Sequence, residues 1–379
     1  MQDMSSTRNW FSPPPPHRRR QFTAASRHGT RIDLGGRTLI NFAANDYLGL
    51  SHHPALCAAA GQVFASGVGS GASRLISGDD PCFHQLEARL AAWKEYEACL
   101  LVGSGMLANI GLIQALADRH THLFSDKLNH ASLVDGARLA GCANHRFAHG
   151  DLAQLETLLQ RHPAARRIIV SDGVFSMDGD CCDAAALLRL AESHDTLLLI
   201  DDAHGIGTVG ADGRGLTALH QIAGHERVIE VGTFGKAFGS YGAFILGTRE
   251  LIEGLRQRQR TMIYSTALPV ALAAAADAAL TLIEQGDAVA ALQRNLAYFK
   301  QHAAQLPLMP SETPIQPLLI GADEAALHAS QQLAECGLFV PAIRPPTVPE
   351  GRARLRITLS AAHTRHEIDQ LVDALRAVR

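Results

Sequence analysis

A chain of 379 residues is longer than one hydrophobic core usually supports, so we expect one large domain and a smaller one. An apolar share of 47% excludes a disordered or fibrous protein, and a formal net charge of -3 gives no reason to expect a nucleic-acid partner. Seven scattered cysteines do not form a disulfide framework, and the first residues lack the apolar run of a secretory signal. We therefore expect a cytoplasmic protein.

Residues 1–45 are expected to form an arm and a hairpin. The four prolines at 13–16 favour polyproline II, and Arg18, Arg19 and Arg20 follow them. This basic run is either solvated or an anion-binding arm at the entrance of a site. Residues 31–40 alternate around two glycines, which predicts a β-hairpin.

Residues 46–285 are expected to form the large domain, in which helices and strands alternate around a mostly parallel sheet. A helix over 54–66 leads into a glycine-rich loop at 67–74, which lacks the preceding strand of a dinucleotide-binding fingerprint. The Ala-rich segment 267–283 contains Asp277 and is predicted to be a packed helix, not a membrane span. Strands are expected at 98–102, 122–125, 167–172, 197–201, 228–231 and 243–246, with crossover helices that include 151–160 and 183–194.

Residues 286–379 change character and are expected to form a smaller α+β domain. A helix precedes a strand near 316–320, and another helix precedes a strand at 355–359. The overall fold class is therefore α/β.

Ligands of parallel sheets gather beyond the carboxyl ends of the strands, and polar segments follow several of the predicted strands. Gly105 and Met106 open a helix after the first strand, which is either an anion site or an ordinary capped turn. His130 follows the second strand, where it could be a cap or could lie flat on an aromatic ligand. Ser176 lies in a loop after the third strand.

The sharpest pattern is a buried strand that ends at Asp201 and is followed three residues later by His204. A carboxylate in this position needs a cation or several hydrogen-bond donors. A protonated pyridine nitrogen would serve, through a charge-assisted hydrogen bond of roughly 1.5–3 kcal/mol. No third ligand stands at a recognisable spacing, so no metal site is expected.

Lys236 follows another strand within a glycine-rich turn, where a lysine is more often a solvated charge. Lysine also forms Schiff bases with carbonyl compounds, and we hypothesise that Lys236 carries pyridoxal 5'-phosphate (PLP). The phosphate loop of nucleotide hydrolases is excluded because Glu230 replaces its first glycine and Ala237 its final Ser/Thr. Thr233, three residues earlier, is placed to bind a phosphate oxygen.

From residue 41 to the C-terminus, these features resemble the α-oxoamine synthases, which are fold-type-I PLP enzymes. The motifs that carry the resemblance are segments 45–50, 129–132, 174–180, 201–205 and 233–236. The resemblance implies a PLP-dependent acyltransferase that works as a homodimer with shared active sites. A non-catalytic protein of this fold would have lost Lys236 or Asp201, and both are present.

The resemblance also implies three sets of site residues. The catalytic residues would be Lys236, His130 and Asp201. The cofactor would be bound by Lys236, Gly105, Met106, His130, Ser176, Asp201, His204 and Thr233. The substrates would be bound by Arg18, Asn45, Arg344, Thr347 and Arg356, with Arg18 facing the acyl group and Asn45 and Arg356 holding the amino-acid carboxylate.

Within this family, segments 342–349 and 354–356 favour the member of biotin synthesis, which condenses L-alanine with a pimeloyl thioester. The thioester could be pimeloyl-CoA or pimeloyl-acyl carrier protein. The alternative is a sister enzyme that uses glycine or serine, such as 5-aminolevulinate synthase, 2-amino-3-ketobutyrate CoA ligase or serine palmitoyltransferase. The lysine and aspartate motifs are shared by all of these enzymes, so they do not indicate which amino acid is the substrate.

Overall fold

The computed structural model describes residues 14–15, 18–19 and 22–378. Much of the predicted arm, including Pro13, Pro16 and Arg20, lies outside the described residues. Within the described part, no helix is long and apolar enough to cross a membrane. The Ala-rich segment instead forms α10 (Val270–Gln285), most of whose alanines are buried in the core, in agreement with the predicted packed helix.

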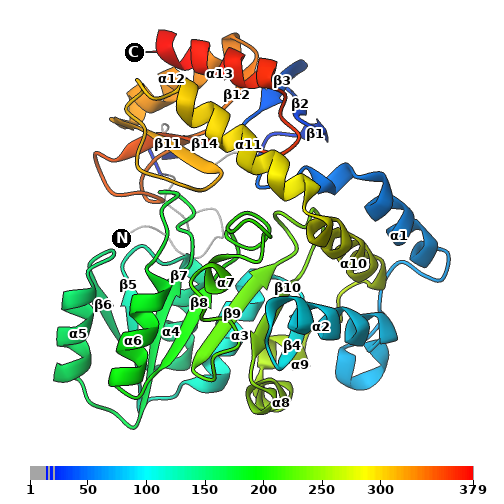
Figure 1. Cartoon of the computed structure of the whole chain (residues 1–379), viewed down its shortest axis with the longest axis vertical. Coiled ribbons are helices and arrows are strands. Elements are labelled where there is room, and N and C mark those ends of the chain that lie inside the picture. The colour runs from blue at the N-terminus through cyan, green and yellow to red at the C-terminus, as the bar shows by residue number, and fades with distance from the viewer. Residues whose placement is uncertain (1–13, 16–17, 20–21, 379) are drawn as a thin grey trace, which may run out of the picture.

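A seven-stranded sheet forms the centre of the larger part of the molecule (Figure 1). In spatial order its strands are β4 (Ala98–Val102), β10 (Ala243–Gly247), β9 (Val228–Thr233), β8 (Leu197–Asp201), β7 (Arg166–Asp172), β5 (Thr121–Asp126) and β6 (Ala143–Phe147). All neighbours pair in parallel except β10, which is antiparallel to both β4 and β9. This confirms the predicted mostly parallel sheet and its six strands, whereas the edge strand β6 was not predicted.

Helices cover both faces of this sheet, which is why its central strands are continuous apolar runs. One face packs on α3 (Gly105–Leu116), α4 (Ala131–Ala140) and α8 (Arg249–Arg258), and α9 (Arg260–Ile263) packs against α3. The other face packs on α2 (Pro81–Lys94), α5 (Leu152–Arg161), α6 (Ala184–Ser193) and α10. The helix α1 (Pro54–Phe64) lies on α10, and the short α7 (Leu216–Leu219) follows β8.

The C-terminal part is a three-stranded antiparallel sheet with helices. Its strands are β11 (Ile315–Gly321), β14 (Ala353–Thr358) and β13 (Ala342–Ile343), and its helices are α11 (Asp287–His302), α12 (Asp323–Glu335) and α13 (Arg365–Ala377). This matches the predicted order of helix, strand, helix and strand.

The N-terminal hairpin is confirmed and lies with this C-terminal part (Figure 1). It consists of β2 (Arg31–Leu34) and β3 (Arg37–Asn41), with an additional strand β1 (Ala25–His28). Gly35 and Gly36 form the two-residue turn and both have positive φ, which glycine adopts without a Cβ clash. The short β12 (Leu338–Phe339) pairs in parallel with β3, so the N-terminal hairpin and a strand of the C-terminal part share one sheet.

Candidate active site

A cavity of about 200 Å³ lies beyond the carboxyl ends of the central strands. It is lined by Gly105, Met106, Asn109, His130, Ser132, Asp172, Val174, Ser176, Asp201, Ala203, His204, Thr233 and Lys236. All eight residues predicted to bind the cofactor are among them. The parallel register brings these residues together, because the last residues of β7 and β8, Asp172 and Asp201, are direct neighbours.

Asp201 is buried and is held by two donors. Asn109 Nδ2 lies 2.6 Å from its Oδ2, and the backbone N–H of Ala203 donates to its Oδ1 at 3.0 Å. These bonds fix the carboxylate at the cavity wall, and its two oxygens retain lone pairs for a further donor. The sequence predicted that Asp201 would need donors, but no signal identified Asn109 as one of them.

The same Asn109 amide connects Asp201 to His130. Asn109 Nδ2 also donates to Ser132 Oγ at 2.9 Å, and Ser132 Oγ lies 2.7 Å from Nδ1 of His130. The backbone N–H of Ser132 points at the same Nδ1 at 3.3 Å, so Nδ1 is an acceptor and the neutral ring carries its proton on Nε2. His130 is therefore both the cap of α4 and a wall of the cavity.

Asp172 is a second buried carboxyl group in the cavity, and it was not predicted as a site residue. Burial raises its pKa well above the usual range, and the negative charge of Asp201 beside it adds to this effect. The backbone N–H of His130 donates to Asp172 Oδ1 at 3.1 Å. Asp172 thus links the end of β7 to the histidine, while Asp201 is the carboxylate with the larger set of donors.

Lys236 follows β9 on a tight turn, and part of its half-buried side chain faces the cavity. Burial lowers the pKa of its amine to about 8, against the opposing effect of the carboxylates of Asp201 and Asp172. The turn closes through Gly239, whose φ is +63° and where a Cβ would lie only 2.4 Å from the backbone nitrogen of Ser51. With this pKa, about a tenth of the Lys236 amine is neutral at pH 7.

His204 is buried opposite the lysine and is held by Tyr47. The Tyr47 hydroxyl lies 2.6 Å from Nδ1 of His204. Burial lowers the pKa of His204 well below its usual value, and the positive charges of Lys236 and Arg356 lower it further, so the ring is neutral. Tyr47 belongs to the 45–50 motif of the sequence, but its contact with His204 was not predicted.

Asn45 and Arg356, predicted to hold a substrate carboxylate, come together across 311 positions of sequence. Arg356 Nη2 donates to Asn45 Oδ1 at 3.1 Å, and its Nε donates to the carbonyl oxygen of Ser176 at 2.6 Å. Ser176 lines the cavity, so this guanidinium is anchored at the cavity rim. The Tyr47 hydroxyl also lies 3.2 Å from Asn45 Oδ1 and connects the pair to His204.

The other predicted substrate residues lie apart from this cluster. Arg18 makes hydrogen bonds of 2.9 and 2.8 Å to the carboxylate of Glu350 and of 3.1 Å to Asp323. Arg344 is half-buried and Thr347 is exposed on one turn, in which the Thr347 N–H donates to the Arg344 carbonyl at 3.0 Å. None of the three is among the described residues that line the cavity. Their substrate contacts stay predictions.

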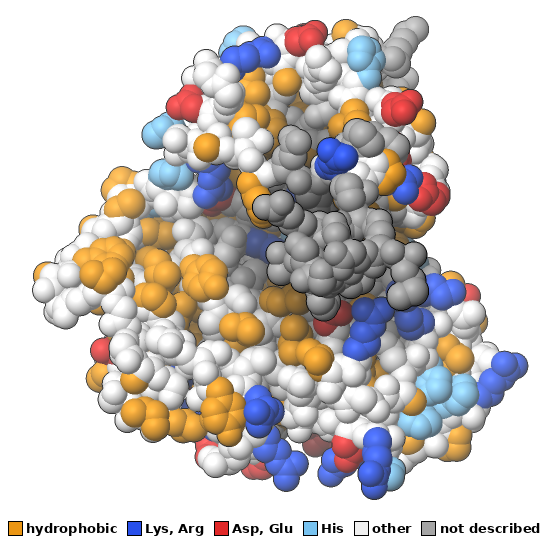
Figure 2. Space-filling model, turned by 180° about the vertical axis from the view of Figure 1, so that it is seen from behind, with side chains coloured by type: hydrophobic (Ala, Val, Ile, Leu, Met, Phe, Trp, Pro, Cys, Tyr) orange, Lys and Arg blue, Asp and Glu red, His pale blue; other side chains and the backbone are white. Residues whose placement is uncertain are grey.

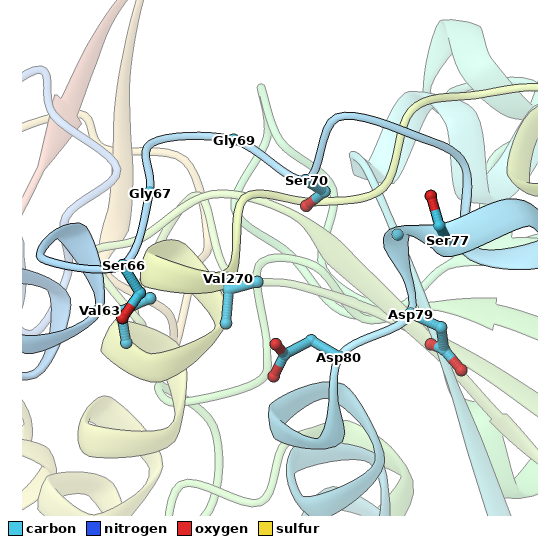
Figure 3. Close-up of a pocket in the computed structure, with 10 residues that line it drawn as sticks. Val63, Ser66, Gly67, Gly69, Ser70, Ser77, Asp79, Asp80 and Val270 are labelled. Carbon is cyan, nitrogen blue, oxygen red and sulfur yellow. The ribbon is translucent and has the colours of Figure 1, made fainter.

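A second cavity, of about 240 Å³, lies between the glycine-rich loop and the start of α2 (Figure 3). Both of its carboxylates are engaged locally: Asp80 accepts from the N–H of Cys82 at the start of α2, and Asp79 pairs with Arg74 at 2.6 Å. Ser70 Oγ donates to the carbonyl of Leu268 at 2.7 Å. These contacts hold the loop, and we assign no chemistry to this cavity.

PLP fits the first cavity. The N–H groups of Gly105 and Met106 precede the first intrahelical bond of α3, which is made by Ala108, so they are donors for a phosphate group. Asp201 offers a fixed carboxylate for a protonated ring nitrogen, and Lys236 offers an amine for the aldehyde. The Thr233 hydroxyl donates to the Gly242 carbonyl at 2.9 Å, so it would have to rotate to bind a phosphate oxygen.

The fold and this arrangement define a fold-type-I PLP enzyme. A family model described as aminotransferase class I and II matches residues 37–375. An 8-amino-7-oxononanoate synthase of Paracidovorax citrulli is 47% identical over 371 residues, covering 94% of this chain and 90% of its own. One from Acidithiobacillus ferrooxidans is 48% identical over 354 residues, covering 92% and 90%. The chain belongs to the aminotransferase class I and II family and, within it, to the 8-amino-7-oxononanoate synthases.

Solved structures agree with this assignment. An 8-amino-7-oxononanoate synthase of Francisella tularensis superimposes with a TM-score of 0.77 at 30% identity, covering 89% of this chain and 97% of that chain. A serine palmitoyltransferase of S. paucimobilis, solved with PLP bound as an adduct with myriocin, has a TM-score of 0.89 at 26% identity, covering 94% and 91%. The fold is therefore shared with the sister enzyme, and the higher sequence identity lies with the synthases. PLP is the cofactor of this class.

Proposed function

We propose that the protein condenses L-alanine with a pimeloyl thioester to give 8-amino-7-oxononanoate, CO2 and a free thiol. The observation that carries this proposal is the convergence of Lys236, Asp201 and His130 on one cavity, in a chain 47% identical to a synthase of that name. The alternative function is that of a sister enzyme that uses glycine or serine. We test it because the fold is similar to that of a serine palmitoyltransferase.

When bound, PLP supplies an electron sink for the charge that is left on the α-carbon of an amino acid after it loses a proton. Lys236 would hold the cofactor through its amine and, once released, take the α-proton, since its pKa of about 8 suits a base near neutral pH. Asp201, held by Asn109 and the Ala203 N–H, would keep a ring nitrogen protonated. The backbone N–H groups of Gly105 and Met106 at the start of α3 would hold the phosphate.

Two groups are placed to orient the substrates. Arg356, anchored by Asn45 and the Ser176 carbonyl, would bind the carboxylate of alanine through a charge-assisted hydrogen bond. His130 carries its proton on Nε2 and would donate it as a hydrogen bond to the thioester oxygen, where negative charge develops when the carbonyl carbon is attacked. The new bond would join the α-carbon of alanine to the carbonyl carbon of the thioester as the thiol leaves. After CO2 is lost, a proton returns to the α-carbon and completes the reaction.

We also propose that two copies associate. The exposed apolar side chains Leu75 and Ile76 lie on the short π-helix Arg74–Gly78, which contacts α9, and the exposed Tyr264 directly follows α9. Apolar side chains gather on the face shown in Figure 2. An exposed apolar patch of this kind is typical of a protein interface. Sedimentation of the purified protein should therefore give twice the chain mass of 40.6 kDa.

We also propose that the protein is located in the cytoplasm.

The test is thiol release from purified protein with each combination of alanine, glycine or serine and pimeloyl-CoA or pimeloyl-acyl carrier protein. Only alanine should release thiol at a high rate, and mass spectrometry should identify 8-amino-7-oxononanoate. A higher rate with glycine or serine, or with a long-chain acyl thioester, would assign the chain to a sister activity instead. Comparing the two pimeloyl donors decides which carrier the enzyme uses.

A further inference from the structure

Three histidines meet at the edge of the central sheet, away from the PLP cavity. His122 lies on β5, His145 on β6, and His162 caps the C-terminus of α5. One ring nitrogen from each lies within 4.8 Å of the others, and all three side chains are half-buried. Figure 2 shows histidine side chains gathered at the side of the molecule that carries α5 and β6.

The fold places these residues together for a simple reason. His122 and Phe124 are two positions apart on β5, so they face the same side of the sheet, and Phe124 is the direct neighbour of His145 on β6. The crossover helix α5 contacts both strands. His162 at its end therefore lies over the two other histidines, with its ring stacked on that of His145 at 3.9 Å between centroids and 19° between planes.

The spacing of two ring nitrogens is close to that of a metal centre. Nε2 of His145 lies 3.3 Å from Nδ1 of His122 in a hydrogen bond, and an ion would replace the proton between them. In a tetrahedral zinc site with Zn–N bonds of about 2.0–2.1 Å, two ligand nitrogens are separated by roughly 3.3–3.4 Å. A ring nitrogen of His162 lies within 4.8 Å of the other two nitrogens, so binding would require the stacked rings of His162 and His145 to turn relative to each other.

The three rings pack directly against one another, and the ring of His122 is tilted against that of His145 at 5.0 Å between centroids. An imidazole binds a metal through the lone pair of a ring nitrogen that carries no proton. Among the described residues, this is the one group of histidine, cysteine or acidic side chains that meets the spacing of a metal site.

We propose that His122, His145 and His162 bind a late first-row divalent cation of the Zn²⁺ type, with water in an open fourth position. Imidazole ligands suit Zn²⁺, Ni²⁺ and Cu²⁺, whereas Mg²⁺ and Ca²⁺ prefer oxygen. His122 is near the amino end of β5, whereas the PLP cavity lies beyond the carboxyl ends of the central strands, so the two sites are separate. The ion would join the edge strand β6 to β5 and to the end of α5.

The experiment is titration of chelator-treated holoenzyme with Zn²⁺ by calorimetry, with Co²⁺ absorbance as a second probe of tetrahedral geometry. Wild-type protein should bind one Zn²⁺ per chain at this site, and Zn²⁺ should raise its thermal midpoint. His145→Gln and His162→Gln should each weaken binding by at least about tenfold, because even an outer-shell partner of a metal ligand is worth that much. At the same Zn²⁺ concentration, both variants should show a smaller rise in thermal midpoint than the wild type.

His220→Gln is the matched control, since His220 is also a half-buried cap at the C-terminus of a helix, α7, but has no histidine partners in the cluster. It should bind Zn²⁺ like the wild type. The proposal is overturned if the two cluster variants keep wild-type affinity, stoichiometry and thermal shift, or if the wild type shows no saturable binding. The absorbance of bound PLP shows whether each variant is folded. If His145→Gln does not fold, the Zn²⁺ affinity of His162→Gln alone tests the proposal.

Discussion

Asn109 and Asp201 are 92 positions apart in the sequence, and a buried hydrogen bond of 2.6 Å joins them. Asn109 lies on α3, whose N-terminal amides are the proposed phosphate site, while Asp201 ends β8. The bond therefore ties the two ends of the cofactor cavity together. Asn109 also donates to Ser132, which contacts His130, so one amide on α3 connects to groups on β8 and at the start of α4.

Asn109→Ala should slow proton exchange at the α-carbon of alanine while PLP remains bound. A hydrogen bond to a charged group is worth roughly 1.5–3 kcal/mol, so we expect a loss of about 10- to 150-fold. Exchange in D2O followed by NMR measures it, with Asn144→Ala on the edge strand as a control that should exchange at the wild-type rate. An unchanged rate in Asn109→Ala would show that Asp201 does not depend on this donor.

Asp201→Asn should abolish most of the same exchange while leaving the fold intact, because a neutral amide does not stabilise a protonated ring nitrogen. The loss should exceed that of Asn109→Ala, since the charge itself is removed. Circular dichroism and cofactor absorbance serve as the controls for folding and loading. If Asp201→Asn exchanges as fast as Asn109→Ala, the carboxylate is not the partner of the ring nitrogen.

The pKa of Lys236 predicts how cofactor uptake depends on pH. Only the neutral amine attacks the PLP aldehyde, and burial lowers this pKa to about 8 from an ordinary value of 10.5. The rate of PLP uptake by the apoprotein should thus rise about tenfold per pH unit below 8 and level off above it. Stopped-flow absorbance gives the profile. A profile still rising steeply above pH 9 would mean that the lysine is not desolvated in the apoprotein.

Lys236→Ala provides the reference for that experiment. Because the variant lacks the amine that binds the aldehyde, it should show no Schiff-base absorbance after dialysis and no thiol release. Lys127→Ala removes an exposed lysine on the loop after β5 and should keep both signals. A yellow, active Lys236→Ala protein would remove the basis of the proposed function.

Arg356→Lys should raise KM for alanine with a smaller change in kcat. Arg356 is held by Asn45 and the Ser176 carbonyl, and a lysine cannot make both contacts while also binding a carboxylate. The loss of one charged hydrogen bond corresponds to a KM increase of about 10-fold or more. Arg352→Lys changes an exposed arginine four residues earlier and is expected to leave KM unchanged. Equal KM values in both variants would place the carboxylate site elsewhere.

The sequence predicted the residues at the strand ends well, because buried parallel strands are apolar runs and the polar residues that follow them stand out. Asp201, His204 and Lys236 were found in this way and line one cavity. The edge strand β6 was missed because its three central residues, Asn144, His145 and Arg146, are polar, so it lacks the apolar run of a central strand.

The contacts between distant elements could not be predicted from the sequence. Nothing in the pattern shows that Asn109 reaches across to Asp201, or that Tyr47 lies beside His204, since both contacts depend on how helices dock on the sheet. The adjacent residues Asp201 and Asp202 also show that the sequence does not reveal which of two neighbouring carboxylates enters the cavity. Asp201 lines the cavity, whereas Asp202 turns away and accepts the N–H of Leu216 at 2.7 Å.

A buried ion pair beneath the site gives a prediction about stability. Lys94 Nζ lies 2.7 Å from Glu230 Oε1, and neither side chain is exposed to solvent. The Thr217 hydroxyl donates to the other oxygen of Glu230 at 2.5 Å. Lys94→Met leaves the glutamate buried without its cation, near Asp202, whose pKa is already raised to about 8 by burial and by the charge of Glu230.

Lys94→Met should therefore lower the free energy of unfolding by about 3–5 kcal/mol, as measured by urea denaturation of the holoenzyme. Arg138→Met breaks an exposed pair with Asp135 on α4 and should cost less than about 1 kcal/mol. The double variant Lys94→Met with Glu230→Gln should recover much of the loss, because the uncompensated charge is gone. If Lys94→Met costs no more than Arg138→Met, the glutamate escapes its penalty by taking up a proton or reaching water.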